Sequence, residues 1–273
     1  MKFYGWRLRS IFDQCRWRRM DRQSFGRSCH RRDVSSYSAL FEAVDAGRGL
    51  LVAIPHFGCF VDSILAMARQ LDGRCRVSVF YEDPGVHAGN ARFDELAGRI
   101  FDDGTLEVLH NGPRGIRRAV KALREGCVVV LLPDVYGPGT PTYPVPFAGG
   151  LRQAAMGAAY LTRKTGALLL PVVSMPKPLG AFESRFGSPI DAGEALPRNF
   201  GKFDEVVRDF RVTRDLFAAL DQLMDAQYLY WQYASSHFGS QGRLHRFDAT
   251  RFSAQIELCL QDPRLRVLQQ KRP

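Results

Sequence analysis

Short apolar runs that end directly in polar loops constrain the fold of this 273-residue chain more than any other feature. Two of the runs end at Pro55 and Pro133, and the next residue is polar in both cases, His56 after the first and Asp134 after the second. Runs of about four to eight apolar residues bounded by turn residues are typical of strands buried on both faces. The sequence therefore predicts buried strands whose ends could together wall one site.

Helical patterns alternate with these strands. The expected strands are 50–54, 76–81, 106–109, 127–132 and 167–173, and the expected helices are 36–45, 64–71, 91–98, 113–126, 154–165 and 206–224. Such alternation indicates a sheet covered by helices. We predict an α/β fold with a mixed, mostly parallel central sheet flanked by helices. This domain would span 34–250, between a basic N-terminal segment at 1–33 and a C-terminal helix with a basic tail at 251–273.

Positive charge is concentrated at the N-terminus. The net charge is +10, and residues 1–32 alone carry +8, from ten Lys or Arg and two Asp. One helical face there is apolar and two tryptophans could anchor it at an interface: Tyr4, Leu8, Ile11, Phe12 and Cys15, with Trp6 and Trp17. An anionic membrane surface, an acidic carrier protein or nucleic acid would each attract such charge. We favour membrane docking by an amphipathic helix over a packing helix with a solvated basic side, and expect no nucleic acid because no reading motif accompanies the charge.

Location and cofactors are constrained by what the sequence lacks. The apolar runs are far shorter than the roughly 20 residues of a membrane span. Arginines interrupt the place where the apolar core of a secretory signal would lie. The six cysteines show no paired spacing, so we expect reduced thiols, no metal and no bound cofactor. We expect a protein that stays on the cytoplasmic side of the membrane.

His56 is the candidate catalytic residue, because it lies where a strand gives way to a helix and Asp62 follows nearby. The sequence has no Gly-x-Ser-x-Gly motif, Walker loop or complete dinucleotide fingerprint, which argues against those classes. An imidazole oriented by a carboxylate can take a proton from a substrate hydroxyl or amine that attacks an activated carbonyl. Backbone N–H groups at Gly58, Gly137 and Gly139 could approach the developing oxyanion. The competing interpretation of His56 is a packing residue.

Four motifs, taken in order, resemble the lysophospholipid acyltransferase superfamily, and most closely its lipid A late (lauroyl/myristoyl) acyltransferase branch. They are His-Phe-Gly at 56–58, Lys-Ala-Leu-Arg-Glu-Gly followed by Val-Val-Val-Leu-Leu-Pro-Asp at 121–134, Val-Pro-Phe-Ala-Gly at 145–149, and Leu-Thr-Arg-Lys-Thr-Gly-Ala at 161–167. The resemblance spans residues 36–238. It implies transfer of a fatty acyl group from an acyl carrier protein or coenzyme A thioester, as cosubstrate, to a hydroxyl of a lipid or glycolipid.

The resemblance implies that His56 is the catalytic histidine and that Asp134 belongs to the third motif. The family's His-x4-Asp/Glu dyad requires a carboxylate at position 61, but this residue is Val61, and Asp62 comes one residue later. One residue on a helix turns a side chain by about 100°. As partner of His56 we rank Asp62 first, Asp134 second and no carboxylate third.

The predicted substrate-binding residues lie in the motif loops and two helices: Gly58, Arg99, Arg114, Arg117, Gly137, Gly139 and Phe147. Arg99 loosely matches a head-group arginine of the family. Arg114 and Arg117 have two interpretations: they contact a phosphate or a carrier protein, or they belong to a solvated helix face. The aromatic cluster at 228–233 is interpreted as core or membrane-edge packing.

Two alternatives to a lipid A-like acyltransferase stay open. One is a catalytically inactive acyl-lipid or acyl-carrier binding protein of the same fold, which Val61 favours and His56 opposes. The other is an acyltransferase that acts on a secondary-metabolite scaffold. We predict a monomeric enzyme, peripheral on the cytoplasmic face of the bacterial inner membrane, with His56 as general base.

Overall fold

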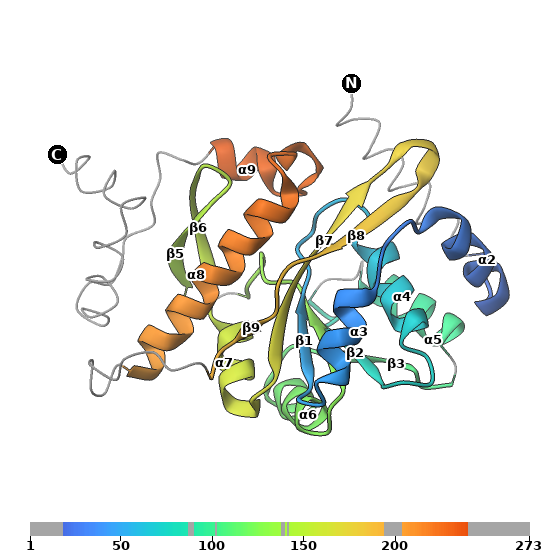
Figure 1. Ribbon diagram of the computed structural model, residues 1–273, viewed down its shortest axis with the longest axis horizontal. Helices are drawn as coiled ribbons and strands as arrows, with labels where there is room; N and C mark the ends of the chain where they lie inside the picture. The colour runs from blue at the N-terminus through green and yellow to red at the C-terminus, as the bar shows by residue number, and fades with distance from the viewer. Residues whose placement is uncertain are drawn as a thin grey trace.

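The computed structural model describes residues 19–86, 90–101, 103–137, 140, 142–193 and 204–239. Its centre is a seven-stranded sheet in the order β3-β2-β4-β1-β7-β8, with β9 also paired to β7 (Figure 1). The strands are β1 (Leu50–Ala53), β2 (Val77–Tyr81), β3 (Leu106–His110), β4 (Val128–Leu131), β7 (Leu168–Pro176), β8 (Phe182–Phe186) and β9 (Ile190–Asp191). The first four of these and β7 are mutually parallel, whereas β8 and β9 run antiparallel to β7. The predicted mixed, mostly parallel sheet is confirmed.

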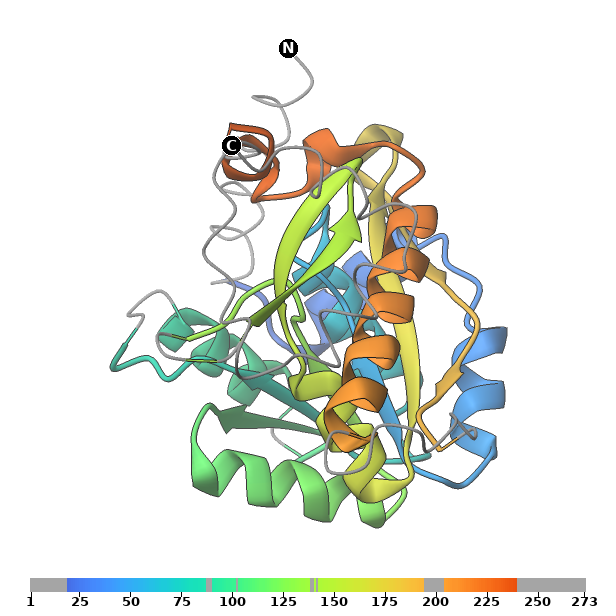
Figure 2. The same cartoon turned by 90° about the vertical axis from the view of Figure 1, so that its left-hand side faces the viewer.

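Helices cover both faces of the sheet (Figures 1 and 2). On one face lie α2 (Arg22–Arg32), α3 (Ser38–Asp45), α4 (Phe60–Gln70) and α5 (Ala91–Ile100). On the other lie α6 (Pro113–Arg124), α7 (Gly157–Thr165) and α8 (Asp204–Met224). Leu51 of β1 packs into the core under α6–α8, and its neighbour Val52 packs into the core under α2–α5. This alternation, with all of β1 buried, explains why the strand is apolar throughout.

A hairpin between β4 and α7 was not predicted. It consists of β5 (Thr142–Phe147) and β6 (Gly150–Ala155), which pair antiparallel around Ala148 and Gly149. Both turn residues have positive φ, 50° and 69°, which suits a two-residue turn between twisted strands. The helix expected at 154–165 was therefore placed too early, since α7 begins at Gly157. The sequence of β6, Gly-Leu-Arg-Gln-Ala-Ala, has no β-branched or aromatic residue, so nothing local distinguished it from the start of a helix.

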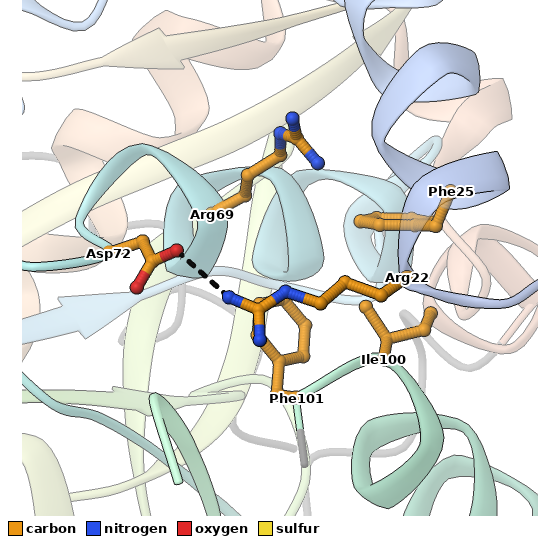
Figure 3. Close-up of a pocket in the computed structure, with 6 residues that line it drawn as sticks. All are labelled: Arg22, Phe25, Arg69, Asp72, Ile100 and Phe101. Carbon is orange, nitrogen blue, oxygen red and sulfur yellow. Dashed lines mark hydrogen bonds and ion pairs between the residues drawn. The ribbon is translucent and has the colours of Figure 1, made fainter. Parts of the chain in front are cut away.

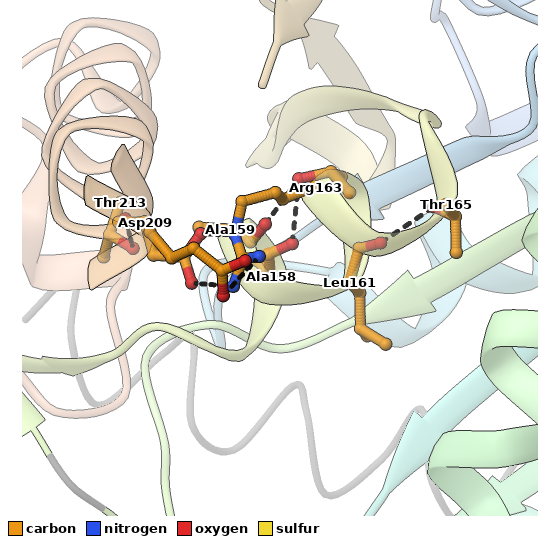
Figure 4. Close-up of polar contacts among 9 residues, drawn as sticks. Ala158, Ala159, Leu161, Arg163, Thr165, Asp209 and Thr213 are labelled. Carbon is orange, nitrogen blue, oxygen red and sulfur yellow. Dashed lines mark hydrogen bonds and ion pairs between the residues drawn. The ribbon is translucent and has the colours of Figure 1, made fainter. Parts of the chain in front are cut away.

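An ion pair fastens α8 to α7. The guanidinium of Arg163 donates from Nε to Asp209 Oδ1 at 2.7 Å and from Nη2 to Asp209 Oδ2 at 2.9 Å (Figure 4). Paired parallel hydrogen bonds of this kind are strong and fix orientation. Helix α8 leads into the short helices η4 (Tyr228–Tyr230) and α9 (Ala234–Gly239), so this pair helps to place the end of the described chain.

Only the second half of the predicted basic N-terminal segment is described. There α2 packs against α4 and α5, and its Phe25 and Cys29 side chains are buried. Residues 1–18, which hold the predicted amphipathic face, and the predicted tail at 251–273 lie outside the described residues. Of the helices that are described, none has the length and apolar content needed to cross a bilayer.

Candidate active site

His56 and Asp134 meet at the carboxyl edge of the parallel sheet. β1 and β4 are neighbours, and Ala53 pairs with Leu131. His56 lies three residues after Ala53, and Asp134 lies three residues after Leu131. The register of the two strands therefore brings the imidazole and the carboxylate side by side.

The carboxylate of Asp134 holds His56 through two hydrogen bonds. Nδ1 of His56 lies 2.9 Å from Oδ1, and the backbone N–H of His56 donates to Oδ2 at 3.0 Å. The Asp134 side chain is 0% exposed, and Trp231 Nε1 also donates to Oδ2, at 2.9 Å. Burial pushes the pKa of Asp134 upward, but the charge of His56 and these hydrogen bonds outweigh it and hold the pKa below its usual value. An ionised Asp134 can only accept, so in the neutral imidazole the proton is on Nδ1 and Nε2 has the lone pair.

The second ring nitrogen of His56, Nε2, is not tied to any described part of the protein. The side chain is 17% exposed, and no described residue hydrogen-bonds to Nε2. The ring is flanked by Phe60, with ring centroids 4.9 Å apart, and by Tyr233, with centroids 5.4 Å apart. The imidazole is therefore fixed on three sides, and its Nε2 has no hydrogen-bond partner among the described residues.

Residues Tyr230–Tyr233, which we call the C-terminal clamp, lie against the loop that holds His56. The Gly58 N–H donates to the Tyr230 carbonyl at 2.9 Å, and the Gln232 N–H donates to the His56 carbonyl at 2.9 Å. Phe57 and Trp231 form an isolated antiparallel bridge between these two bonds. The sequence interpretation of this aromatic cluster as packing missed its contact with the site.

Arg152 of β6 lies next to His56 and Asp134, which we call the dyad. Sequence reasoning missed this residue. Its Nη2 donates to the Asp134 carbonyl at 2.7 Å. The guanidinium lies over the rings of Trp231 and Tyr233, at 5.0 and 5.5 Å from their centroids. The hairpin β5–β6, which was not predicted, thus places the Arg152 guanidinium beside the C-terminal clamp.

The sequence of residues 29–193 matches the model of one protein family, the bacterial lipid A biosynthesis acyltransferases. The match covers more than half of the chain. The chain belongs to this family. It is therefore an acyltransferase of the lipid A type, which takes an acyl donor and a lipid acceptor, and the resemblance of the four motifs is confirmed. A comparison with curated proteins found no match.

In this acyltransferase the expected ranking of the histidine's partners was wrong. His56 bonds to Asp134, whereas Asp62 in the first turn of α4 is buried and pairs with Arg32 of α2, with Nη1 and Oδ1 2.9 Å apart. Arg32 also donates from Nε to the Gly180 carbonyl at 2.6 Å. The turn before α4 is not rearranged to bring Asp62 round to the imidazole. This carboxylate instead joins α4 to α2 through Arg32, and Arg32 in turn reaches the β7–β8 turn.

Replacing Arg32 with methionine is expected to lower the free energy of unfolding by about 3 kcal/mol, because Asp62 stays buried and loses this cation. Urea unfolding measures the change. The double variant Arg32→Met/Asp62→Leu should recover much of that loss, since apolar replacement of a buried pair is often nearly neutral. A double variant as unstable as the single one would show that the pair is not the source of the effect.

Gly58 is needed for close backbone approach and not as an oxyanion donor. Its φ is +58°, and a Cβ there would lie 1.9 Å from the Ser174 carbonyl oxygen and 2.8 Å from Cδ of Pro176. Its N–H already donates to Tyr230. The expectation that this N–H would meet a substrate oxygen is therefore corrected by the structure.

Substituting Gly58 with alanine should destabilise the fold by at least about 2 kcal/mol, from strain at positive φ and from overlap with backbone atoms. Thermal unfolding would report it. Gly157→Ala is the matched control, because a Cβ there would meet nothing within 4 Å and helix α7 starts at that residue. Equal melting temperatures for the two variants would contradict the packing described here.

The other predicted substrate-binding residues are dispersed. Phe147 is 1% exposed and packs in the core with its ring 5.0 Å from Trp231, so it supports the clamp and does not face a substrate, contrary to expectation. Gly137 lies in the loop after Asp134, where a Cβ would come within 3.7 Å of Glu82. Gly139 lies outside the described residues.

The predicted arginines are exposed at a distance along the sheet. Arg99 is in the last turn of α5, and Arg114 and Arg117 are on α6, whose start follows β3. β2 lies between β3 and β4, the strand that leads to Asp134. No described carboxylate forms an ion pair with Arg114 or Arg117, whereas Arg118 pairs with Glu107.

A cavity of about 280 Å³ lies between α2, α4 and α5 (Figure 3). Its lining combines apolar rings with charged groups: Arg22, Phe25, Arg69, Asp72, Ile100 and Phe101. None of these side chains bonds to the dyad, so the cavity is separate from the candidate active site. Among the described residues, no group of three or more His, Cys, Asp and Glu side chains could hold a metal ion.

Proposed function

We propose that this acyltransferase moves a fatty acyl group from an acyl carrier protein or coenzyme A thioester to a hydroxyl of a lipid A-like glycolipid, with His56 as general base. The single observation that carries the proposal is the His56–Asp134 contact, which leaves Nε2 with a lone pair on a side chain that is 17% exposed. Val61 in place of an acid was the reason to consider an inactive binding protein. Asp134, in the loop after β4, supplies a carboxylate to His56 and so supports the enzyme instead.

In the proposed reaction, Nε2 of His56 takes the proton of the acceptor hydroxyl while its oxygen attacks the thioester carbonyl. The imidazolium is stabilised by the buried Asp134 carboxylate. The tetrahedral intermediate collapses with cleavage of the C–S bond, and the departing thiolate takes the proton back from Nε2. An ester and a free thiol are the products, and His56 returns to its starting state.

We propose that the basic face of α6 meets the acyl donor. Arg114 and Arg117 are exposed and have no described carboxylate in an ion pair. Both candidate donors are anionic, so this face suits either, and a contact of this kind weakens as salt screens it. The basic residues at 1–32, apart from Arg22 and Arg32, which pair with Asp72 and Asp62, are proposed to hold the enzyme on the cytoplasmic face of the inner membrane.

The test is a transfer assay with purified protein, acyl-carrier and coenzyme A thioesters supplied separately, and three acceptors: a lipid A precursor, a total bacterial lipid extract and a polyketide-type hydroxylated scaffold. Mass spectrometry identifies acylated products, and anionic and neutral liposomes report membrane binding. The expected result is acylation of the lipid A precursor by wild type and not by His56→Gln. If only the polyketide-type scaffold is acylated, the acceptor is a secondary metabolite and not a lipid A-like glycolipid. If the protein retains the donor but forms no product, the proposed chemistry is wrong.

A further inference from the structure

Trp231 contacts the dyad as well as the core. Its side chain is 0% exposed, and its indole packs against Phe147 in the core under α6–α8. The same indole donates from Nε1 to Oδ2 of Asp134 at 2.9 Å. Three N–H donors therefore hold this carboxylate, two from His56 and one from the C-terminal clamp.

The backbone on each side of Trp231 is tied to the backbone around His56. The preceding carbonyl, of Tyr230, accepts from Gly58, and the following N–H, of Gln232, donates to the His56 carbonyl. The position of the indole N–H is thereby set relative to the imidazole through two bonds of 2.9 Å. Arg152 lies over the indole ring and bonds to the Asp134 carbonyl, so it braces both partners.

We propose that Trp231 is a positioning residue for the transfer reaction. Its N–H fixes the Asp134 carboxylate in the orientation that bonds Nδ1 of His56, so that Nε2 faces the acceptor. The inference rests on the proposed role of His56 as general base. Without this donor, Oδ2 keeps only the backbone N–H of His56, and the carboxylate gains freedom to turn away from the ring.

Two substitutions at one position separate the hydrogen bond from the packing. Trp231→Phe removes the donor and part of the ring, whereas replacement of Trp231 by 3-benzothienylalanine, introduced by codon reassignment, removes the N–H and keeps the shape. Tyr228→Phe is the matched control, because the Tyr228 hydroxyl donates to the Asp221 carboxylate at 2.8 Å in the same part of the chain, away from the dyad. Circular dichroism and thermal unfolding report whether each variant folds.

The benzothienyl variant is expected to lower kcat about tenfold to a hundredfold, the usual effect of losing one hydrogen bond to a charged group, with KM changed less than about twofold. The acid limb of kcat/KM should move to higher pH, because a carboxylate with one donor fewer attracts the His56 proton more strongly. Tyr228→Phe should change neither quantity. Wild-type kcat and an unmoved acid limb in the benzothienyl variant would reduce Trp231 to a packing residue.

Proton NMR tests the contact independently of turnover. The Nδ1 proton of His56, assigned by its disappearance in His56→Gln, should give a resonance that shifts in the benzothienyl variant and not in Tyr228→Phe. If wild type fails to transfer any acyl group but this shift occurs, the proposed chemistry fails while the positioning contact stands. An unshifted resonance would overturn the positioning claim whatever the enzyme's activity.

Discussion

Replacing His56 with glutamine is expected to lower kcat about 10²- to 10⁴-fold, the loss typical of removing a well-placed general base. Glutamine is similar in size and keeps the backbone N–H that donates to Asp134, so the loop after β1 should survive. Its amide nitrogen cannot take the proton of the acceptor hydroxyl. Initial rates over a range of acceptor concentrations separate this fall in kcat from any change in KM.

The fold provides a second histidine–carboxylate contact as a control. His110 at the end of β3 has Nε2 3.2 Å from Asp94 Oδ2, and it lies at the strand two places away from β4. His110→Gln should leave kcat within about twofold of wild type, because it is not tied to the clamp. Equal losses at positions 56 and 110, or a His56→Gln enzyme with normal kcat, would remove His56 from the mechanism.

Asp134→Asn should be almost as damaging, with kcat reduced about 10³-fold, and the reason is the position of a proton. Two donors, the His56 backbone N–H and Trp231 Nε1, meet at the Oδ2 position, so the amide oxygen of asparagine would occupy it. The amide NH₂ would then face Nδ1 of His56, which must become the acceptor. The neutral imidazole would carry its proton on Nε2, where a general base needs a lone pair.

Asp62→Asn provides the direct contrast. Its carboxylate pairs with Arg32 and not with His56, so the variant should lose stability in urea but keep kcat within about threefold of wild type. Measuring kcat and urea unfolding for both asparagine variants tests the assignment. A large loss of kcat in Asp62→Asn beside a normal Asp134→Asn would restore the family's helix-borne acid and contradict the geometry described here.

Much of the fold could be predicted because most of its strands and helices have local sequence patterns. The buried run before His56 and the Pro113–Gly126 pattern each became the expected element, as β1 and α6. The hairpin β5–β6 was missed because β6 has no local strand pattern and exists through its pairing with β5. Local pattern is a weak guide when tertiary pairing decides.

The site was only partly predictable for a related reason. That two strand ends would wall one site followed from the sequence, but the choice of carboxylate depended on which strands are neighbours and on their register. β1 lies beside β4, and His56 and Asp134 each come three residues after the paired residues Ala53 and Leu131. The two side chains therefore meet. The contacts of Trp231 and Arg152 join segments distant along the chain, and neither residue type nor spacing signals them.

The position of the C-terminal clamp in the sequence determines when its contact with Asp134 can form during translation. Asp134 is translated 97 residues before Trp231, as the difference of their numbers shows, and at about 5–20 residues per second the ribosome needs roughly 5–20 s to cover that interval. During this time the emerging chain holds both His56 and Asp134 but not the indole that meets the carboxylate. The last donor to the Asp134 carboxylate therefore arrives after α8 has been made. A nascent chain that stalls before Trp231 would hold His56 and Asp134 without this third hydrogen bond.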